Sequence, residues 1–291
     1  MYIDLQKIVT RDGIVLDGGA ILPKRRGTMA FVFIHGLSGN FYGWFSKIQP
    51  LVRRCTQKRI AFFSFNNRGA GVVTSLYRNR KNVKRLRGGA AFEHFSECVL
   101  DIRAAIDFLG THGYRNIVLV GHSTGANKAV YYLWKTRDRR VKHVVLLGPL
   151  SDVVGEMQLR GRRLPAFLKK ARTQVRTGKG HELFRAVLPE YVWSAARYLS
   201  LSTSGSAEDT FPYYRKNGNW RAVESIRVPL TVIVGSNDQY LDRDASDVIM
   251  ALQQHAVRTR KFRGIIIPEA DHSFNGKEKE LAAALLTTVI A

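Results

Sequence analysis

The stretch Ile117-Val118-Leu119-Val120-Gly121-His122-Ser123-Thr124-Gly125 decides the fold. Its four leading apolar residues predict a buried strand, and the run over 126–130 that follows is typical of a helix. Between them stands the pattern Gly-x-Ser-x-Gly, a strained strand-to-helix turn that exposes a serine hydroxyl at the end of a sheet. Glycine is needed at both ends because side chains there would collide with the neighbouring strand and helix. Ser123 is therefore the candidate nucleophile.

Further apolar runs on both sides of this stretch predict a central sheet. They show little period-two alternation, which is typical of strands buried on both faces. These runs cover 29–34, 59–65, 141–147, 230–234 and 261–267. Residues 5–9 and 14–22 predict an antiparallel hairpin at the sheet edge. Helices are expected over 95–109, after Ser123, over 244–254 and over 277–289. The alternation predicts an α/β fold with an eight-stranded, mostly parallel sheet and helices on both faces.

One segment, residues 150–224, interrupts the alternation of strands and helices. It has no buried-strand pattern and is rich in Arg, Lys and aromatic residues such as Trp193 and Trp220. An unstructured loop of this length is rare inside a compact domain, so the segment predicts an inserted helical cap. The expected organisation is a first core part over 1–149, the cap over 150–224 and a second core part over 225–291.

A serine nucleophile needs a base, and the base needs a third group that orients it. Asp238 and His272 each follow a predicted strand, so both are expected at the carboxyl edge of the sheet, where Ser123 lies. The chain order Ser, Asp, His is the order that accompanies this turn. Asp242 and Asp244 are alternatives to Asp238, although Asp244 also suits the N-cap of the next helix.

Acyl chemistry on Ser123 also needs two N–H donors for the oxyanion. We expect one from the backbone of Thr124, directly after the nucleophile. The second is expected from the loop that begins at His35, where we assign the amide of Leu37. His35 and His122 are interpreted as packing and hydrogen-bonding residues beside the site.

Together these segments resemble the α/β-hydrolase superfamily over nearly the whole chain outside the cap. The turn Asn66-Asn67-Arg68-Gly69-Ala70-Gly71 is similar to the superfamily's Asp-x-Arg-Gly-x-Gly segment, with Asn66 where Asp is usual. Within the superfamily, the chain most resembles small carboxylesterases, including feruloyl- and siderophore-esterase-like proteins. The resemblance implies a serine hydrolase that cleaves carboxylic esters or thioesters through an acyl-enzyme on Ser123, without a cofactor.

Two other kinds of function stay open at this point. The same triad on the same fold can hydrolyse amides, lactones or carbon–carbon bonds, or transfer an acyl group to an alcohol. A protein of another class, a ligand receptor or an anion-binding module, can also retain the hydrolase architecture. An intact triad argues against a pure receptor, because a binder does not need all three groups.

The charge balance is strongly positive, with 46 Lys and Arg against 23 Asp and Glu and a net charge of +23. Such a field attracts anions without identifying them. Two basic runs stand out: Arg78, Arg80, Lys81, Lys84, Arg85 and Arg87, and then Arg160, Arg162, Arg163, Lys169, Lys170, Arg172, Arg176 and Lys179. They indicate either a solvated face or attraction of an anionic ester substrate. Nucleic acid is not expected as a partner, and membrane-surface contact has no support, because no binding motif accompanies the charge.

Two further expectations come from what the sequence lacks. It shows no secretory signal and no apolar run near the roughly 20 residues that a membrane helix needs, so a cytoplasmic protein is expected. Cys55 and Cys98 lie far apart and have no partners at metal-ligand spacing. Neither a disulfide nor a metal site is therefore expected.

Overall fold

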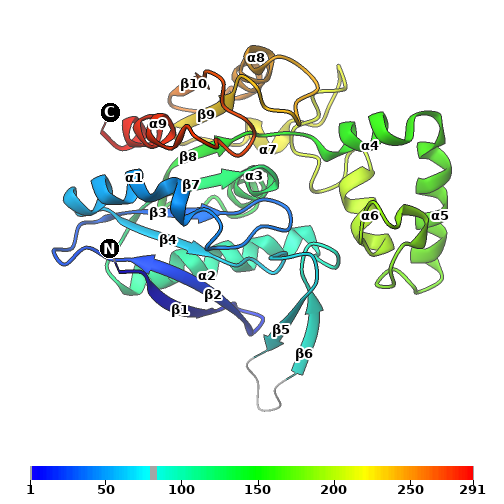
Figure 1. Ribbon diagram of the computed structural model, residues 1–291, viewed down its shortest axis with the longest axis horizontal. Helices are drawn as coiled ribbons and strands as arrows, with labels where there is room; N and C mark the ends of the chain where they lie inside the picture. Colours follow the sequence, from blue (N-terminus) through cyan, green and yellow to red (C-terminus); the bar gives the residue numbers. More distant parts are fainter. Residues whose placement is uncertain (1, 79–83, 291) are drawn as a thin grey trace.

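The computed structural model describes residues 2–78 and 84–290, and these form one ten-stranded sheet with helices on both faces (Figure 1). The strand order is β10-β9-β8-β7-β3-β4-β2-β5-β6, and β1 pairs with β2. Six neighbouring strands are parallel: β3 (Met29–Ile34), β4 (Ala61–Phe65), β7 (Asn116–His122), β8 (Val141–Leu147), β9 (Leu230–Gly235) and β10 (Phe262–Ile267). Antiparallel pairing adds β1 (Asp4–Val9), β2 (Ile14–Ile21), β5 (Thr74–Arg78) and β6 (Lys84–Gly88). The α/β class and the mostly parallel sheet are confirmed.

The prediction of eight strands was wrong, because β5 and β6 add a hairpin to the edge of the sheet. The hairpin joins β2 through two residue pairs, Ile14 with Arg78 and Val15 with Tyr77. Its one apolar cross-strand pair, Leu76 opposite Leu86, packs against the core. The remaining positions are mostly polar or basic, so the segment has the charge of a solvated loop and not the apolar pattern of a strand.

Some residues of the first basic run fall outside this description. Arg80 and Lys81 lie outside the described residues, as does the side chain of Lys84.

Alternate residues of β7 face two separate apolar layers. Ile117 and Leu119 point toward α2 (Cys98–Thr111), α3 (Thr124–Thr136) and α8 (Ala245–His255). Val118 and Val120 point toward α1 (Phe45–Gln57) and α9 (Glu278–Ile290). A short 3-10 turn, Phe95–Glu97, precedes α2. Because helices cover both faces of the sheet, a ligand can reach the sheet only where its strands end.

Helix α1 was not predicted from the sequence. Its buried residues Ile48, Leu51, Val52 and Cys55 recur with helical spacing. Pro50 lies inside the helix and removes one backbone donor, which is a pattern that normally argues against a helix. Packing against α9 therefore outweighs the unfavourable effect of Pro50 on helix formation in this segment.

The insertion contains helices α4 (Asp152–Arg160), α5 (Leu164–Arg176), α6 (Ala195–Ser202) and α7 (Arg221–Glu224), with 3-10 turns at Gly161–Arg163 and Arg185–Val187. Helices α4, α5 and α6 lie beyond the arrowheads of the parallel strands (Figure 1). Helices α5 and α6 share an apolar cluster that includes Phe184, Trp193 and Tyr198. Trp220 and Val223 instead pack in the same cluster as α2 and α3. That the insertion begins at residue 150 and ends at residue 224 stays a prediction.

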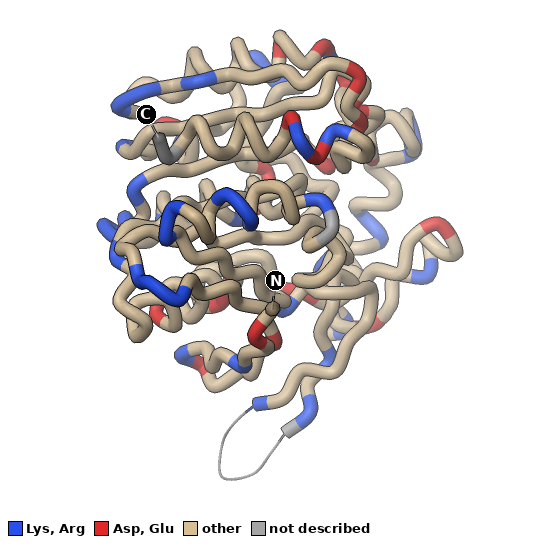
Figure 2. The backbone as a smooth tube through the Cα atoms, turned by 60° about the vertical axis from the view of Figure 1, so that its left-hand side comes forward, with Lys and Arg blue, Asp and Glu red and all other residues tan. Residues whose placement is uncertain are grey.

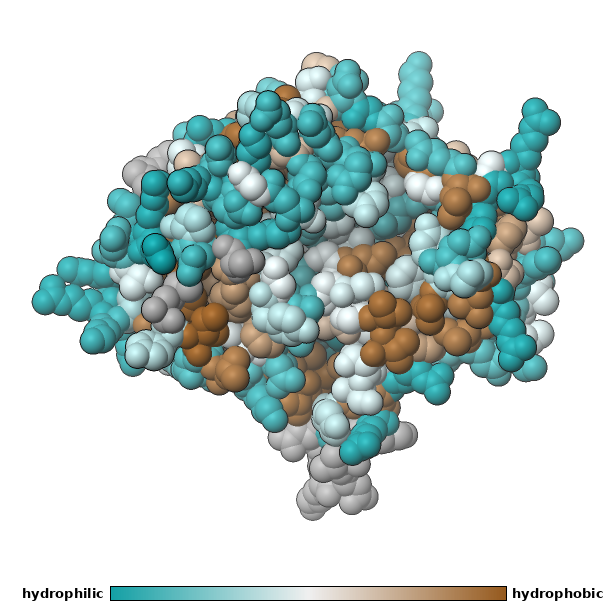
Figure 3. Space-filling model, viewed as in Figure 1, coloured by the Kyte–Doolittle hydropathy of each residue, from teal (hydrophilic) through white to brown (hydrophobic). Residues whose placement is uncertain are grey.

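Seen from the same side as in Figure 1, the surface of the molecule is largely hydrophilic (Figure 3). Hydrophobic side chains gather toward the lower right of this view, near the insertion. No helix in the described part of the chain combines the length and the apolar character needed to cross a membrane.

A chain of buried ion pairs joins the insertion to α3. Lys128 of α3 pairs with Glu93, which also lies 3.4 Å from the guanidinium of Arg197 on α6. Arg197 donates a second bond of 2.9 Å to Glu208, and all four side chains are almost completely buried. Burial alone would raise the pKa of Glu93, but Lys128 and Arg197 outweigh it and hold the pKa below its usual value. Two cations thus balance two carboxylates inside the protein.

We expect Lys128→Met to destabilise the fold, because it leaves Glu93 buried with one cation in place of two. The loss of one partner from a buried pair typically costs about 3 to 5 kcal/mol in the free energy of unfolding. Urea unfolding followed by circular dichroism measures this loss. The matched control is Lys169→Met on the exposed face of α5, which should change stability by less than about 0.5 kcal/mol. Equal losses in the two variants would contradict the role of the buried pair.

Candidate active site

Ser123 lies in a strained backbone conformation between β7 and α3. Its φ is 54° and its ψ is −127°, a region that residues with a side chain rarely adopt. Its N–H donates to the carbonyl of Leu147 at 2.9 Å, and its own carbonyl accepts from the N–H of Ala126 at 2.8 Å. The turn is therefore held from β8 on one side and from the first turn of α3 on the other.

Three glycines allow the close backbone contacts around this turn. A Cβ on Gly121 would lie 2.2 Å from the carbonyl oxygen of Gly125, and one on Gly125 would lie 2.2 Å from that of Ile34. A Cβ on Gly36 would lie 2.9 Å from the Cβ of Ser123. The predicted need for glycine at both ends of the Ser123 turn is confirmed. The loop after β3 also approaches Ser123 closely only because residue 36 is glycine.

Asp238 and His272 meet at the same edge of the sheet. Asp238 follows β9, His272 follows β10, and the Nδ1 of His272 lies 2.7 Å from the Oδ2 of Asp238. The second oxygen of Asp238 accepts the N–H of Tyr240 at 3.0 Å. Asp242 instead pairs with Arg243. Among the candidate acids, it is Asp238 that the fold brings to the histidine.

Gly148 links this pair to the turn of Ser123. A Cβ on Gly148 would lie 3.0 Å from the ring of His272 and 3.1 Å from the carboxylate of Asp238. Gly148 directly follows Leu147, whose carbonyl binds the N–H of Ser123. The histidine, its carboxylate and the serine are therefore grouped around the carboxyl end of β8. Their catalytic roles stay predictions.

Three side chains hold the loop that carries His272. The Nε2 of His122 lies 2.8 Å from the carbonyl oxygen of His272, and the Nζ of Lys47 donates to the carbonyl of Ser273 at 3.1 Å. Gln239 accepts the N–H of His272 through its side-chain oxygen at 3.1 Å. The predicted hydrogen-bonding role of His122 is confirmed. Lys47 and Gln239 were not found, because they act on main-chain atoms and have no sequence pattern.

His122 is neutral and is fixed as a hydrogen-bond donor. Its ring lies between Trp44 and His272, with ring centroids 4.3 Å and 4.7 Å away. Burial lowers the pKa of His122 far below its usual value, and the neighbouring His272 lowers it further. The neutral ring carries one proton, and the carbonyl of His272 requires that proton on Nε2.

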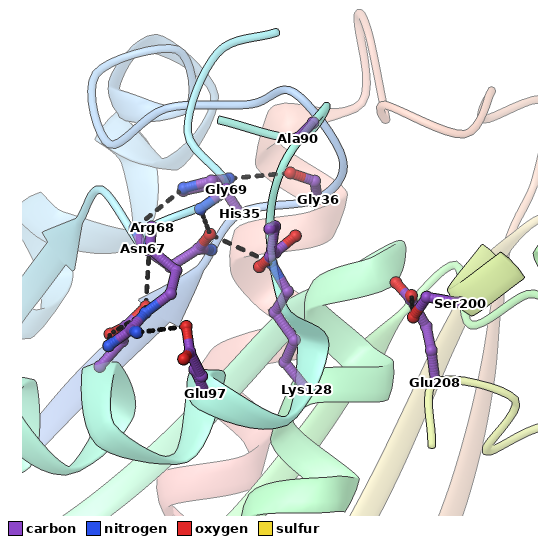
Figure 4. Close-up of polar contacts among 12 residues, drawn as sticks. His35, Gly36, Asn67, Arg68, Gly69, Ala90, Glu97, Lys128, Ser200 and Glu208 are labelled. Atoms are coloured by element: carbon purple, nitrogen blue, oxygen red, sulfur yellow. Dashed lines mark hydrogen bonds and ion pairs between the residues drawn. The ribbon is translucent and has the colours of Figure 1, made fainter. Parts of the chain in front are cut away.

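A second neutral histidine, His35, orders the loop expected to supply an oxyanion donor (Figure 4). Its Nδ1 donates to the carbonyl of Gly36 at 2.8 Å, and its Nε2 accepts the N–H of Asn67 at 3.2 Å. Lys128 in turn donates to the side-chain oxygen of Asn67 at 3.1 Å. Burial lowers the pKa of His35 to about 4, and the charge of Lys128 contributes. The loop after β3 is thus tied to the same buried lysine that connects α3 to the insertion.

The amides of Leu37 and Thr124 directly follow Gly36 and Ser123, whose atoms approach closely. Within the described residues, neither N–H donates to a protein acceptor. Their role in oxyanion binding stays a prediction.

The turn over 66–71 contacts the loop after β3 through His35 and is itself held by ion pairs. Arg68 makes a 2.7 Å ion pair with Asp101 and another of 2.5 Å with Glu97. Asn66, which stands where Asp is usual, accepts the N–H of Phe41 at 2.8 Å through its side-chain oxygen. The amide oxygen thus supplies the acceptor that a carboxylate would provide.

The apolar cluster of the insertion contacts the loop after β3. Leu37 packs against the cluster formed by α5, α6 and their connections, and Phe92 and Tyr191 also border that cluster. Nothing in the described ranges groups three or more His, Cys, Asp or Glu side chains in a way that could hold a metal ion. Cys55 and Cys98 are buried and free.

Comparisons with known proteins agree with this fold. A model described as the alpha/beta hydrolase family matches residues 31–284. A Mycoplasma genitalium protein, whose name proposes an esterase or lipase, is 28% identical over 223 residues, covering 75% of this chain and 74% of that protein.

Two solved structures are similar in fold. The siderophore hydrolase EstB of Aspergillus fumigatus has a TM-score of 0.69 at 16% identity, over 98% of this chain and 97% of that one. Est1E of Butyrivibrio proteoclasticus, solved with ferulic acid, has a TM-score of 0.62 at 17% identity, over 98% and 100% of the two chains. Since the family model spans most of the sequence, this chain belongs to the alpha/beta hydrolase family.

Proposed function

We propose that the protein is a serine hydrolase that cleaves carboxylic esters through an acyl-enzyme on Ser123. The observation that carries the proposal is the hydrogen-bonded pair of His272 and Asp238 beside the strained turn of Ser123. The Mycoplasma genitalium relative, whose name proposes an esterase or lipase, supports an ester substrate. So do the structural neighbours, which include a carboxylesterase of Bacillus subtilis.

In the proposed acylation step, the hydroxyl oxygen of Ser123 attacks the ester carbonyl while the Nε2 of His272 takes its proton. The N–H groups of Leu37 and Thr124 bind the oxygen that becomes negative. Asp238 accepts a hydrogen bond from Nδ1 and stabilises the imidazolium. His272 then donates the proton to the leaving alkoxide, and an alcohol departs.

In the second step a water molecule replaces the alcohol. His272 takes a proton from this water, the resulting hydroxide attacks the acyl carbonyl, and the carboxylic acid is released as Ser123 regains its proton. All protons pass through the same ring, which makes the fixed orientation of His272 central to both steps.

The surroundings of the site favour an ester with an apolar or aromatic acyl part. Leu37 carries one of the proposed oxyanion donors and packs against the apolar cluster of the insertion. An acyl group held beside these side chains would exclude water from the carbonyl, which strengthens the hydrogen bonds that bind the oxyanion. The ferulic acid seen with Est1E is an aromatic acid of this general kind. Thioesters are the alternative substrate of the same site.

The nucleophile is tested with Ser123→Ala. We expect a fluorophosphonate probe to label the unaltered protein but not this variant, because the probe reacts with an activated serine hydroxyl. Hydrolysis of p-nitrophenyl acetate should be lost in parallel. The matched control is Ser75→Ala at an exposed position of β5, which should retain both signals. Equal labelling of both variants would exclude Ser123 as the nucleophile.

The acid is tested by comparing Asp238→Asn with Asp242→Asn. An amide at position 238 favours the wrong tautomer of His272, and at similar triads this change lowers kcat about 10⁴-fold. Asp242 pairs with Arg243 on the surface, so its replacement should leave kcat within about twofold. Steady-state kinetics on the same ester measures both variants. A larger loss in Asp242→Asn would reassign the acid.

The hydrogen bond from His122 to the loop of His272 predicts different kcat values for two replacements of His122. His122→Phe removes the donor to the carbonyl of His272 and should lower kcat about 10- to 100-fold, because small displacements of a catalytic group have effects of this size. His122→Gln keeps an N–H donor and should recover most of the loss, with KM similar in all three proteins. Equal kcat values for the Phe and Gln variants would show that packing, and not the hydrogen bond, matters.

A further inference from the structure

Exposed basic residues precede every parallel strand of the sheet. They lie in the loops that lead into β3, β4, β7, β8, β9 and β10 or at the first residues of those strands. We call this set the basic edge: Lys24, Arg25, Arg26, Lys58, Arg59, Arg115, Arg137, Arg139, Lys142, Arg227, Arg258, Arg260, Lys261 and Arg263. Parallel strands all begin at the same edge, so residues from six separate parts of the sequence are collected on one surface.

The charge of the basic edge is uncompensated. The same loops contain one carboxylate, Asp138, which already bonds Arg140 at 2.7 Å and the hydroxyl of Tyr132 at 2.6 Å. In the described part of the chain, no residue of the basic edge forms an ion pair with a carboxylate. When the left-hand side of Figure 1 is turned forward, Lys and Arg recur along this edge (Figure 2). The net charge of +23 is therefore concentrated in part on a surface away from the active site.

The basic edge lies at the opposite end of the strands from Ser123. The carboxyl ends of β7, β9 and β10 lead to Ser123, Asp238 and His272, whereas the basic edge precedes the amino ends. Six parallel strands spaced about 4.8 Å apart extend this row of loops over roughly 24 Å. A surface of this length can contact several phosphates of a polymer at once.

We propose that the basic edge binds the phosphate backbone of a nucleic-acid duplex, without reading its sequence. Ten of its fourteen residues are arginine. The planar guanidinium forms paired hydrogen bonds with phosphate oxygens, which makes Arg the preferred residue for nucleic-acid backbones. Release of counterions from a duplex supplies the free energy of such binding.

Two features favour a duplex over a membrane surface or a single strand. Val257 is the one exposed large apolar side chain in the described residues of these loops, so little surface is available to enter a lipid bilayer. Membrane binding by a surface depends on buried apolar area as well as charge. These loops also present no exposed aromatic side chain in their described part, and stacking on aromatics is what single strands normally use.

The sequence did not predict this surface, and the expectation that nucleic acid is not a partner rested on the lack of a binding motif. The residues of the basic edge occur singly or in short groups, separated by whole strands and helices. Only the parallel sheet brings them together. A motif search therefore has nothing to find in this case.

Two charge-matched variants test the proposal. The edge variant replaces Arg25, Arg26, Arg59, Arg139, Arg258 and Arg260 with Gln. The control variant replaces Arg162, Arg163, Lys169, Lys170, Arg172 and Arg176 of the insertion with Gln, and all six of these are exposed. Each variant removes six positive charges, so their net charges are identical.

Fluorescence anisotropy with a labelled duplex of about 20 base pairs at about 100 mM salt measures the affinity. We expect the edge variant to bind at least about 10-fold more weakly than the unaltered protein, with a shallower salt dependence, because fewer phosphates are neutralised. The control variant should stay within about threefold. Equal weakening of the two variants would overturn the proposal, because it would show a general effect of net charge.

A second arm separates the duplex from a membrane. Vesicles of phosphatidylcholine and phosphatidylserine should bind the edge variant and the control variant equally. Loss of vesicle binding in the edge variant alone, with duplex binding unchanged, would assign the surface to a membrane and overturn the proposal. Hydrolysis of p-nitrophenyl acetate should be unchanged in the edge variant, which reports on its folding. Duplex binding is measured independently of hydrolysis, so failure of the ester proposal and failure of this one are distinguishable.

Discussion

The backbone of Ser123, held at a positive φ of 54°, is the constraint on which the site depends. A residue with a side chain stays in this region only when the surrounding structure fixes it from several directions. Here the carbonyl of Leu147 and the first turn of α3 hold the residue, and the glycines at 36, 121 and 125 let three backbone segments pass within contact of one another. The loop of Gly36 approaches Ser123 closely in this arrangement, and Leu37 directly follows Gly36. The strain and the candidate oxyanion site are consequences of one packing arrangement.

Histidines at this edge of the sheet perform different structural tasks because their environments differ. Burial lowers the pKa of His35 and of His122, so each ring is neutral and carries one proton. That proton lies on the ring nitrogen that donates to a backbone carbonyl. His35 fixes the loop of Gly36, and His122 fixes the loop of His272. The ring of His272 contacts Asp238 through Nδ1. Its Nε2 makes no hydrogen bond to another of the described residues. Lys128 connects these groups to the insertion, because it bonds Asn67 beside His35 and pairs with Glu93 beside Arg197.

The sequence predicted those parts of the fold that local patterns specify. The turn around Ser123, the buried parallel strands and the positions of Asp238 and His272 at strand ends follow from apolar runs, glycine spacing and chain order. Features that depend on contacts between distant segments were missed. Helix α1 tolerates Pro50 because α9 packs against it, and the β5–β6 hairpin has a single apolar pair in an otherwise polar or basic ribbon. Lys47 and Gln239 reach main-chain atoms of another loop, which no spacing along the chain reveals.

The parallel sheet also keeps part of the excess positive charge, the basic edge, away from the candidate active site. Carboxyl ends of the strands gather the serine, the histidine and the aspartate, and amino ends gather the basic edge. A strand of six residues places these two edges roughly 20 Å apart. Exposed charges are screened over about 8 Å at physiological ionic strength. The basic edge, whose charges are exposed, therefore contributes little to the potential at Ser123. In the two proposals made above, an ester binds at the carboxyl ends of the strands and a duplex at the basic edge, and the two sites share neither charged residues nor loops.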